Sequence, residues 1–261
     1  MTTLAAHNPC VVAIASLPAL SFLLRRITGA DEAALSAERP GEPTRLLAAL
    51  LRGADGAAVD MAALPAPVHD RLLAEVFRLD VGPRATCRAA CTACSEPFEF
   101  DLAIAEVVAA QDAEAAKIGP PGADGRWTVA GHRVRVPLLG DAQGGDTPAL
   151  MSALCDAPPD IKMIVDIAAF LEQAAPLLAF DLDAACPHCA AAQRLAFDLP
   201  RFLVRAVAHD RPFLIRETHL LAARYGWSHA EIMALPRDDR RAFATLIETE
   251  RSASLRQRAS A

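Results

Sequence analysis

The sequence predicts a mainly helical α+β fold: a split, zinc-ribbon-like β element carries an inserted hairpin and helices, and a C-terminal helical module follows it. Three observations lead to this prediction. Hydrophobic residues make up 53% of the chain and aromatic residues only 5%, which favours an alanine-rich, aliphatic and helical core. Two Cys-x-x-Cys segments are each followed by a strand-like stretch. After Pro200, helix start and stop signals predict a series of short helices.

We expect three regions, at residues 1–66, 67–200 and 201–261. In the first region, Pro and Gly break the chain into short helices. One of them is expected to run from Thr44, a candidate N-cap, to Arg52 and to end at Gly53. The stretch from there to Pro67 is rich in Gly, Ala and Pro and is expected to be a loop or linker.

The apolar run at residues 10–24 bears on localisation. It is shorter than the roughly 20 residues of a membrane span, and Pro18 interrupts it. No Lys or Arg precedes it, as one would in a signal peptide. We therefore expect a buried N-terminal strand or helix in a cytoplasmic bacterial protein, where close thiol pairs bind metal more often than they form disulfides.

Periodicity assigns the elements of the second region. The apolar residues of 68–79 fall on one helical face. Phe98, Phe100 and Leu102 alternate with acidic residues, as in a half-buried strand. The other expected elements are a helix at 103–117, a loop at 119–125, a β-hairpin at 126–138 with its turn at Ala130-Gly131, and helices at about 147–155 and 160–173.

The third region is expected to be helical. One helix ends at Gly226, and Ser228 with Glu231 forms a capping box that opens the next. A last helix begins at Pro236, and we expect its tail, residues 251–261, to fray.

Two segments of the chain resemble each other: CTACSEPFEFDL and CPHCAAAQRLAFDL. In each, a Cys-x-x-Cys turn precedes a strand-like stretch that ends in Phe-Asp-Leu. Two thiolates at this spacing can point at one ion, so two pairs complete a tetrahedral shell. Thiolate ligands suit zinc. The sequence therefore predicts one structural zinc site formed, across the long insertion 95–185, by Cys91, Cys94, Cys186 and Cys189.

Two other interpretations of these cysteines stay open. One is that they are ordinary buried thiols. The other is a thiol oxidoreductase that uses Cys186 and Cys189, because Cys-Pro-His-Cys also occurs in strongly oxidising thioredoxin-type centres. The remaining Cys10, Cys87 and Cys155 are expected to be small buried hydrophobic residues, although Cys87 is close enough to Cys91 to substitute as a ligand.

Other chemistry is not indicated. The chain has no glycine-rich phosphate loop, no Gly-x-Ser-x-Gly and no His-Glu-x-x-His. Its scattered histidines offer no nucleophile–base pair, and His188 is expected to be exposed between two cysteines. A net charge of -6 and acidic strands after both Cys pairs disfavour binding to nucleic acid. We therefore expect a protein that is not an enzyme.

A longer pattern resembles a known family. Over about residues 68–255 the chain carries, in order, DRLLAEVF, a first CxxC with FEFDL, WTVAGHRVRVPL, a second CxxC with AFDL, and RETHLLAARYGWSHAEIMALPRDDRRAFATLIE. This order is similar to the hub assembly chaperones of T-even-type phage baseplates, which are also found in phage-tail-like contractile injection systems. The C-terminal Tyr-Gly-Trp-Ser…Glu-Ile…Ala-Leu-Pro…Arg-Arg segment is the most specific part of the resemblance.

The resemblance implies a non-enzymatic assembly chaperone or minor structural component of a baseplate, stabilised by structural zinc. Its partners would be hub, spike or tube proteins of a contractile particle, with no membrane involved, and incorporation into the particle is left open. The four cysteines carry over, but the family's usual glycine after each second cysteine is here Ser95 or Ala190. Tyr225 and Trp227, at a helix junction, are expected in the core or otherwise at a partner-binding site. A zinc-ribbon regulator that binds nucleic acid is the alternative beside the oxidoreductase.

Overall fold

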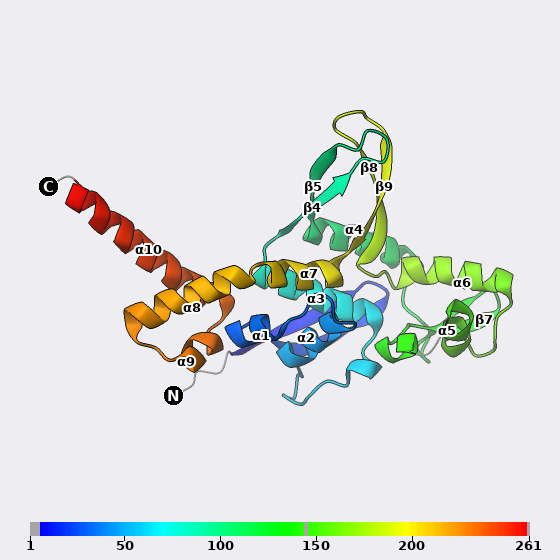
Figure 1. Ribbon diagram of the computed structural model, residues 1–261. Helices are drawn as coiled ribbons and strands as arrows, with labels where there is room; N and C mark the ends of the chain where they lie inside the picture. Colours follow the sequence, from blue (N-terminus) through cyan, green and yellow to red (C-terminus); the bar gives the residue numbers. More distant parts are fainter. Residues whose placement is uncertain (1–5, 144–145, 260–261) are drawn as a thin grey trace.

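The computed structural model describes residues 6–143 and 146–259. About 51% of the chain is helical and the strands form small antiparallel sheets, so a mixed, mainly helical fold is confirmed (Figure 1). The strands are β1 (His7–Ile14), β2 (Leu17–Arg25), β3 (Leu51–Gly53), β4 (Arg84–Ala90), β5 (Pro97–Ala103), β6 (Arg126–Val129), β7 (His132–Arg135), β8 (Ala179–Ala185) and β9 (Ala192–Asp198). The α-helices are α1 (Gly29–Ala34), α2 (Glu42–Leu50), α3 (Ala66–Asp80), α4 (Ile104–Ile118), α5 (Thr147–Leu154), α6 (Ile161–Ala174), α7 (Leu199–His209), α8 (Arg211–Tyr225), α9 (His229–Ala234) and α10 (Arg237–Ala259). Two short 3-10 segments are η1 (Met61–Ala63) and η2 (Leu139–Gln143).

The first region contains two short helices, α1 and α2, as expected, and also a three-stranded sheet, in which the apolar run takes the strand form of the expected buried strand or helix. β1 and β2 form an antiparallel hairpin, and β3 pairs with the other edge of β2. The apolar run at 10–24 is therefore most of two strands joined by a turn at Ala15-Ser16. Alternate side chains, Val12 with Ile14 and Phe22 with Leu24, are buried. This period of two is that of a strand with one face on the core.

The helix predicted at residues 44–52 is shifted. α2 begins two residues earlier, after Gly41, whose φ of 70° is left-handed, and Thr44 is not its N-cap. The Thr44 hydroxyl lies 3.2 Å from His69 Nε2 of α3. Gly53, expected to end the helix, is instead the last residue of β3, because residues 51–53 pair with β2. A tertiary strand contact has overridden the local helix-stop signal.

Each Cys pair lies in the turn of a hairpin that leads directly into a helix, so the internal repeat is a ββα unit. β4 and β5 continue into α4, and β8 and β9 continue into α7. In both units the second strand begins at the third residue after the second cysteine, at Pro97 and Ala192. The two Phe-Asp-Leu stretches are therefore two residues out of register: Leu102 is still in β5, whereas Leu199 already starts α7. In Figure 1 the two hairpins stand side by side, away from the body.

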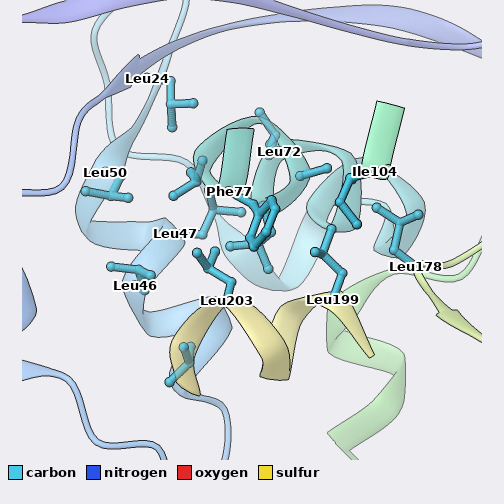
Figure 2. Close-up of a cluster of buried hydrophobic side chains, with 14 of the residues drawn as sticks. Leu24, Leu46, Leu47, Leu50, Leu72, Phe77, Ile104, Leu178, Leu199 and Leu203 are labelled. Atoms are coloured by element: carbon cyan, nitrogen blue, oxygen red, sulfur yellow. The ribbon is translucent and has the colours of Figure 1, made fainter. Parts of the chain in front are cut away.

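The largest hydrophobic core lies under these hairpins and fixes their bases. It joins the N-terminal sheet, α2, α3 and α7. Figure 2 shows Phe77 of α3 near Leu47 of α2 and Leu203 of α7, and all three are 0% exposed. Burying each such side chain contributes roughly 1.5–3 kcal/mol. Because this core extends from Val12 to Val207, it includes residues on both sides of the boundaries expected at 66 and 200.

The inserted segment and the C-terminal module have smaller cores. The predicted hairpin turns at Ala130-Gly131 and packs with α5 and α6 around Val134 and Ile167. α8, α9 and α10 pack around Leu221 and Ile232. The expected helix positions in both segments agree with the structure to within about two residues.

A buried ionic cluster holds the C-terminal module against α1. Arg240 of α10 is 0% exposed and pairs with Glu32 of α1 and, at 2.7 Å, with Glu217 of α8. Arg237 also reaches Glu32, at 3.1 Å. The backbone N–H of Arg237 donates to the Ile27 carbonyl. The module is therefore anchored to the N-terminal region by polar contacts between segments about 200 residues apart.

The expected fraying of the C-terminal tail is wrong for the residues described. α10 continues to Ala259 and extends away from the body in Figure 1. Neither Gly nor Pro interrupts it, and Arg224 of α8 pairs with Glu250 at 3.0 Å. Within residues 6–143 and 146–259, no helix combines the length and the apolar character needed to cross a membrane.

Candidate metal centre

The four predicted cysteines converge. All four sulfur atoms lie within 4.8 Å of one another, so the cluster could hold a metal ion. Across the two hairpins, the Sγ atoms of Cys91 and Cys189 are 3.7 Å apart, and those of Cys94 and Cys186 are 3.8 Å apart. The first cysteine of each pair is 2% exposed, whereas the second reaches the surface. Convergence across the long insertion is the main site prediction, and the geometry agrees with it.

The two turns share one hydrogen-bond pattern. In the first, Cys91 N donates to the Glu96 carbonyl at 3.0 Å and Ser95 N donates to the Cys91 carbonyl at 2.9 Å. In the second, Cys186 and Ala190 make the equivalent bonds, both 2.9 Å long. The tight turn places both sulfurs of a pair on the same side of the chain. Each turn is thus a half-site, and the two halves face each other.

Left-handed backbone follows the second cysteine in both turns. Ser95 has φ 61° and Ala190 has φ 58°. For a residue with a Cβ atom this conformation costs roughly 1–2 kcal/mol, whereas glycine adopts it freely. The two positions are those at which the resembled family has glycine. Both turns therefore carry a side chain in a left-handed conformation, at a conformational cost.

The turn amides favour a thiolate at one of the four positions. The backbone N–H of Cys94 has the largest effect on Cys91, and despite the opposing effect of burial it lowers the pKa of that thiol, together with the Ala93 N–H and neighbouring thiols, to about 6. Ala93 N lies 3.3 Å from Cys91 Sγ. The Glu96 N–H has the largest single effect on Cys94 and lowers its pKa, but burial and the other three thiols together raise it to about 12. A divalent cation among these sulfurs would remove the mutual repulsion of several thiolates and displace their protons.

Side chains also tie the two hairpins together at their tips. Gln193 of β9 is 4% exposed, and its Oε1 accepts from Thr92 N at 2.9 Å and from Thr92 Oγ1 at 3.1 Å. His188 Nε2 lies 3.3 Å from the Pro97 carbonyl, and His188 is exposed, as expected. Sequence reasoning missed Gln193 because a single glutamine in a strand belongs to no recognisable pattern.

Consecutive polar residues of α3 fix the bases of the hairpins. Asp70 Oδ2 accepts from Leu178 N, just before β8, at 2.8 Å. Arg71 donates to Gln111 and Asp112 of α4, both at 2.9 Å, and α4 follows β5 directly. Both are buried, so these bonds are shielded from water. One helix therefore positions the end of one hairpin unit and the beginning of the other.

The same helix contains a hydrogen-bonded chain that the sequence did not indicate. His69 Nδ1 lies 2.9 Å from Asp70 Oδ1, and its Nε2 faces the Thr44 hydroxyl. His69 and Asp70 are both buried. A hydroxyl, an imidazole and a carboxylate in series resemble a hydrolase triad in composition. Here the three side chains link α2 to α3 through Thr44 and His69, and α3 to the start of β8 through Asp70. Their hydrogen bonds therefore have a structural role.

The other cysteines lie apart from the cluster, as expected. Cys87 and Cys155 are buried and Cys10 is half-buried. Burial is the largest influence on all three and raises the pKa of each thiol. Cys87 belongs to the main core and does not replace a member of the four.

The aromatic corner of the C-terminal module divides into a core side and a surface side. Trp227 packs on the core of the module and meets Phe243 edge to face at 5.2 Å. Tyr225 stacks on Trp227 at 4.9 Å and is 37% exposed. The expected capping box is present: Ser228 N donates to the Glu231 carboxylate at 2.8 Å, which confirms Glu231 as a cap.

Known proteins give no further guide to these residues, since no protein-family model, curated protein or solved structure matches the chain.

Proposed function

We propose that Cys91, Cys94, Cys186 and Cys189 hold one structural zinc ion. With Zn–S bonds of about 2.3 Å, a tetrahedral site has S···S edges of about 3.8 Å. The two distances across the hairpins, 3.7 and 3.8 Å, match that edge. Four thiolates suit zinc, and they leave no ligand position open for a substrate. The proposed role of the ion is therefore to clamp the two ββα units together.

On this clamp we propose a non-enzymatic assembly chaperone, or a minor structural component, of the baseplate hub of a contractile phage tail or phage-tail-like injection system. The observation that carries it is the pairing of two ββα units by a closed four-cysteine cluster, in the segment order of the resembled family. Apolar side chains on three helices also favour protein contacts: Ile161 and Val165 on α6, Phe213 and Ile215 on α8, and Leu246 on α10 are exposed.

Two experiments test this proposal separately. Elemental analysis of the native protein should find one zinc per chain, and replacing Cys186 and Cys189 by Ser should abolish it. A tagged chain, purified from cells that express the genes of a contractile particle, should retain a hub, spike or tube protein. Tyr225→Ala should weaken that retention if the surface side of the aromatic corner binds the partner. Recovery of the chain without any baseplate protein would contradict the assembly role and leave the zinc result untouched.

The two alternatives have less support. The hairpins expose acidic residues at Glu99, Asp101 and Asp181, and Arg88 and Arg194 pair with Glu99 and Asp181 within their own hairpins. Such a surface would repel a nucleic-acid backbone. A salt-dependent shift of DNA or RNA in a gel would restore that alternative.

A thiol oxidoreductase needs an accessible, activated nucleophilic cysteine, commonly at a helix N-terminus. Cys186 is instead buried in a turn between two strands. Turnover in an insulin-reduction assay would restore this alternative.

A further inference from the structure

The distance between the two half-sites is not set by a β-sheet. β4–β5 and β8–β9 are separate two-stranded sheets, with no ladder between them. A site assembled from two independent hairpins binds metal tightly only if other contacts already hold the halves together, because otherwise the metal must order them. The contacts that do so are therefore determinants of metal affinity.

At the tips, Gln193 makes the most direct of these contacts. It belongs to the second hairpin, and its amide oxygen accepts both hydrogen bonds from Thr92, which lies between Cys91 and Cys94 of the first. Its amide nitrogen donates to the Ala192 carbonyl at 2.9 Å and is 3.4 Å from the Ala191 carbonyl. Both ends of the side chain are thus engaged, one in each half-site, across the gap that the metal would span.

The repeat shows that this glutamine is not a requirement of the hairpin itself. The equivalent position of the first unit, the second residue of β5, is Phe98, which is buried at the cysteine cluster. A buried apolar side chain is thus compatible with the ββα unit. A buried amide costs free energy unless its hydrogen bonds are satisfied, and here they are satisfied by the opposite turn.

We propose that Gln193 is a positioning residue of the metal centre: its bonds to Thr92 hold the first Cys-x-x-Cys turn in the orientation that binds the ion. This inference rests on the proposed zinc site and deepens it. Outer-sphere hydrogen bonds that orient metal ligands typically change metal affinity by 10–100-fold, and the Gln193 bonds orient the turn that carries Cys91 and Cys94. Asp70 and Arg71 hold the same two units at their bases, whereas Gln193 acts at the opposite end, where His188 also contacts the Pro97 carbonyl of the first hairpin.

The test is a set of metal-affinity measurements on the full chain. Zinc affinity is measured by competition with a chelating dye, and Co²⁺ absorption reports tetrahedral thiolate ligation. Gln193→Leu keeps most of the volume and should weaken zinc binding about 10–100-fold. Arg194→Ala, the control, removes an exposed ion pair within one hairpin and should leave affinity unchanged within about twofold.

A double-mutant cycle distinguishes positioning from general destabilisation. Thr92→Ala removes only the hydroxyl bond and should weaken zinc binding less than Gln193→Leu does. In the Gln193→Leu background it should have no further effect, because the shared acceptor is already gone. Additive losses, or unchanged affinity in Gln193→Leu, would overturn the positioning role. A native chain that binds no zinc would instead overturn the metal centre on which it rests. Unfolding of the metal-free variants, measured in parallel, identifies any loss of affinity that comes from misfolding.

Discussion

The left-handed residues after each second cysteine predict that substitution by glycine stabilises this protein, which is the opposite of its usual effect. Replacing a residue by glycine usually destabilises a protein, because the unfolded chain gains entropy. The free energy of unfolding falls by about 0.5–1 kcal/mol as a result. At Ser95 and Ala190 the native φ values of 61° and 58° impose roughly 1–2 kcal/mol of strain on a side chain with Cβ. The difference predicts that Ser95→Gly and Ala190→Gly each stabilise the protein by about 0.5–1 kcal/mol.

The assay compares thermal unfolding and zinc affinity. For a chain of this size each substitution should raise Tm by about 1–4 °C. If the turns become ordered only when zinc binds, each substitution should instead increase the zinc affinity, by about two- to fivefold. Ala130, in the β6–β7 turn, also has a positive φ of 50° but lies outside the cluster. Ala130→Gly should therefore raise Tm and leave zinc affinity unchanged.

Ala93→Gly is the matched negative control, because Ala93 is in the same turn as Ser95 and is not among the described residues with positive φ. It should lower stability or leave it unchanged. If Ser95→Gly lowered Tm as much as Ala93→Gly does, strain at the turn would not be a significant part of the free energy of this site.

Two further predictions concern buried charged side chains. Arg240→Met leaves buried Glu32 with Arg237 alone and Glu217 with only the longer contact to Arg241, and should cost about 3 kcal/mol in denaturant unfolding. Arg216→Ala, which breaks an exposed pair with Glu248, should cost less than about 1 kcal/mol, and equal losses would contradict the ranking. Burial raises the pKa of Asp80 to about 6 despite its bond to Arg26. Because this pKa is raised above the unfolded value, the contribution of Asp80 to stability is complete below about pH 4 and is lost as pH rises through 6. Asp80→Asn should flatten the stability–pH curve in that window, and an unchanged curve in urea titrations from pH 4 to 7 would refute the assignment.

Sequence reasoning succeeded where the determinants are local or repeated. Three correctly predicted features depend only on residues that are close in sequence. They are the capping box of Ser228 and Glu231, the turn at Ala130-Gly131 and the helix at 68–79. The cysteine cluster is a long-range contact, but its two halves carry the same motif, so chemistry alone pairs them. These parts were predictable because the information lies within each short segment.

The rest depends on partners distant in sequence. The turn at Ala15-Ser16 has none of the Gly, Asn or Asp residues that mark a hairpin, so the β1–β2 hairpin looked like one apolar run. The pairing of Glu32 with Arg240 joins residues 208 positions apart, and nothing in either local sequence indicates it. The local sequence does not indicate the role of Gln193 either, because that role depends on Thr92, 101 positions away.

The position of the cysteine cluster indicates what the ion would stabilise. The tips of the hairpins have only a small core, which consists of Cys91, Cys186 and Phe98 with a few half-buried neighbours. Ala85, Cys87 and Phe197, nearer the bases, belong instead to the large core with α3 and α7. A cluster of that size buries too little apolar surface to hold two hairpins together alone, which is the situation in which small structures depend on metal.

Metal removal should therefore make the tips open locally more often, with only contacts such as Gln193 to Thr92 left to restrain them, and should leave the body folded. After chelation, amide hydrogen exchange should accelerate at residues 88–99 and 184–195, while α3 and α7 keep their protection. The helical circular dichroism should change little, because most helices lie outside the tips. Lower pH should have the same effect at a given zinc concentration, since the ligands must be deprotonated and protons compete with the ion for sulfur. Cooperative loss of protection in α3 on chelation would mean that the cluster supports the whole chain, and the separation between the tip core and the main core would then be wrong.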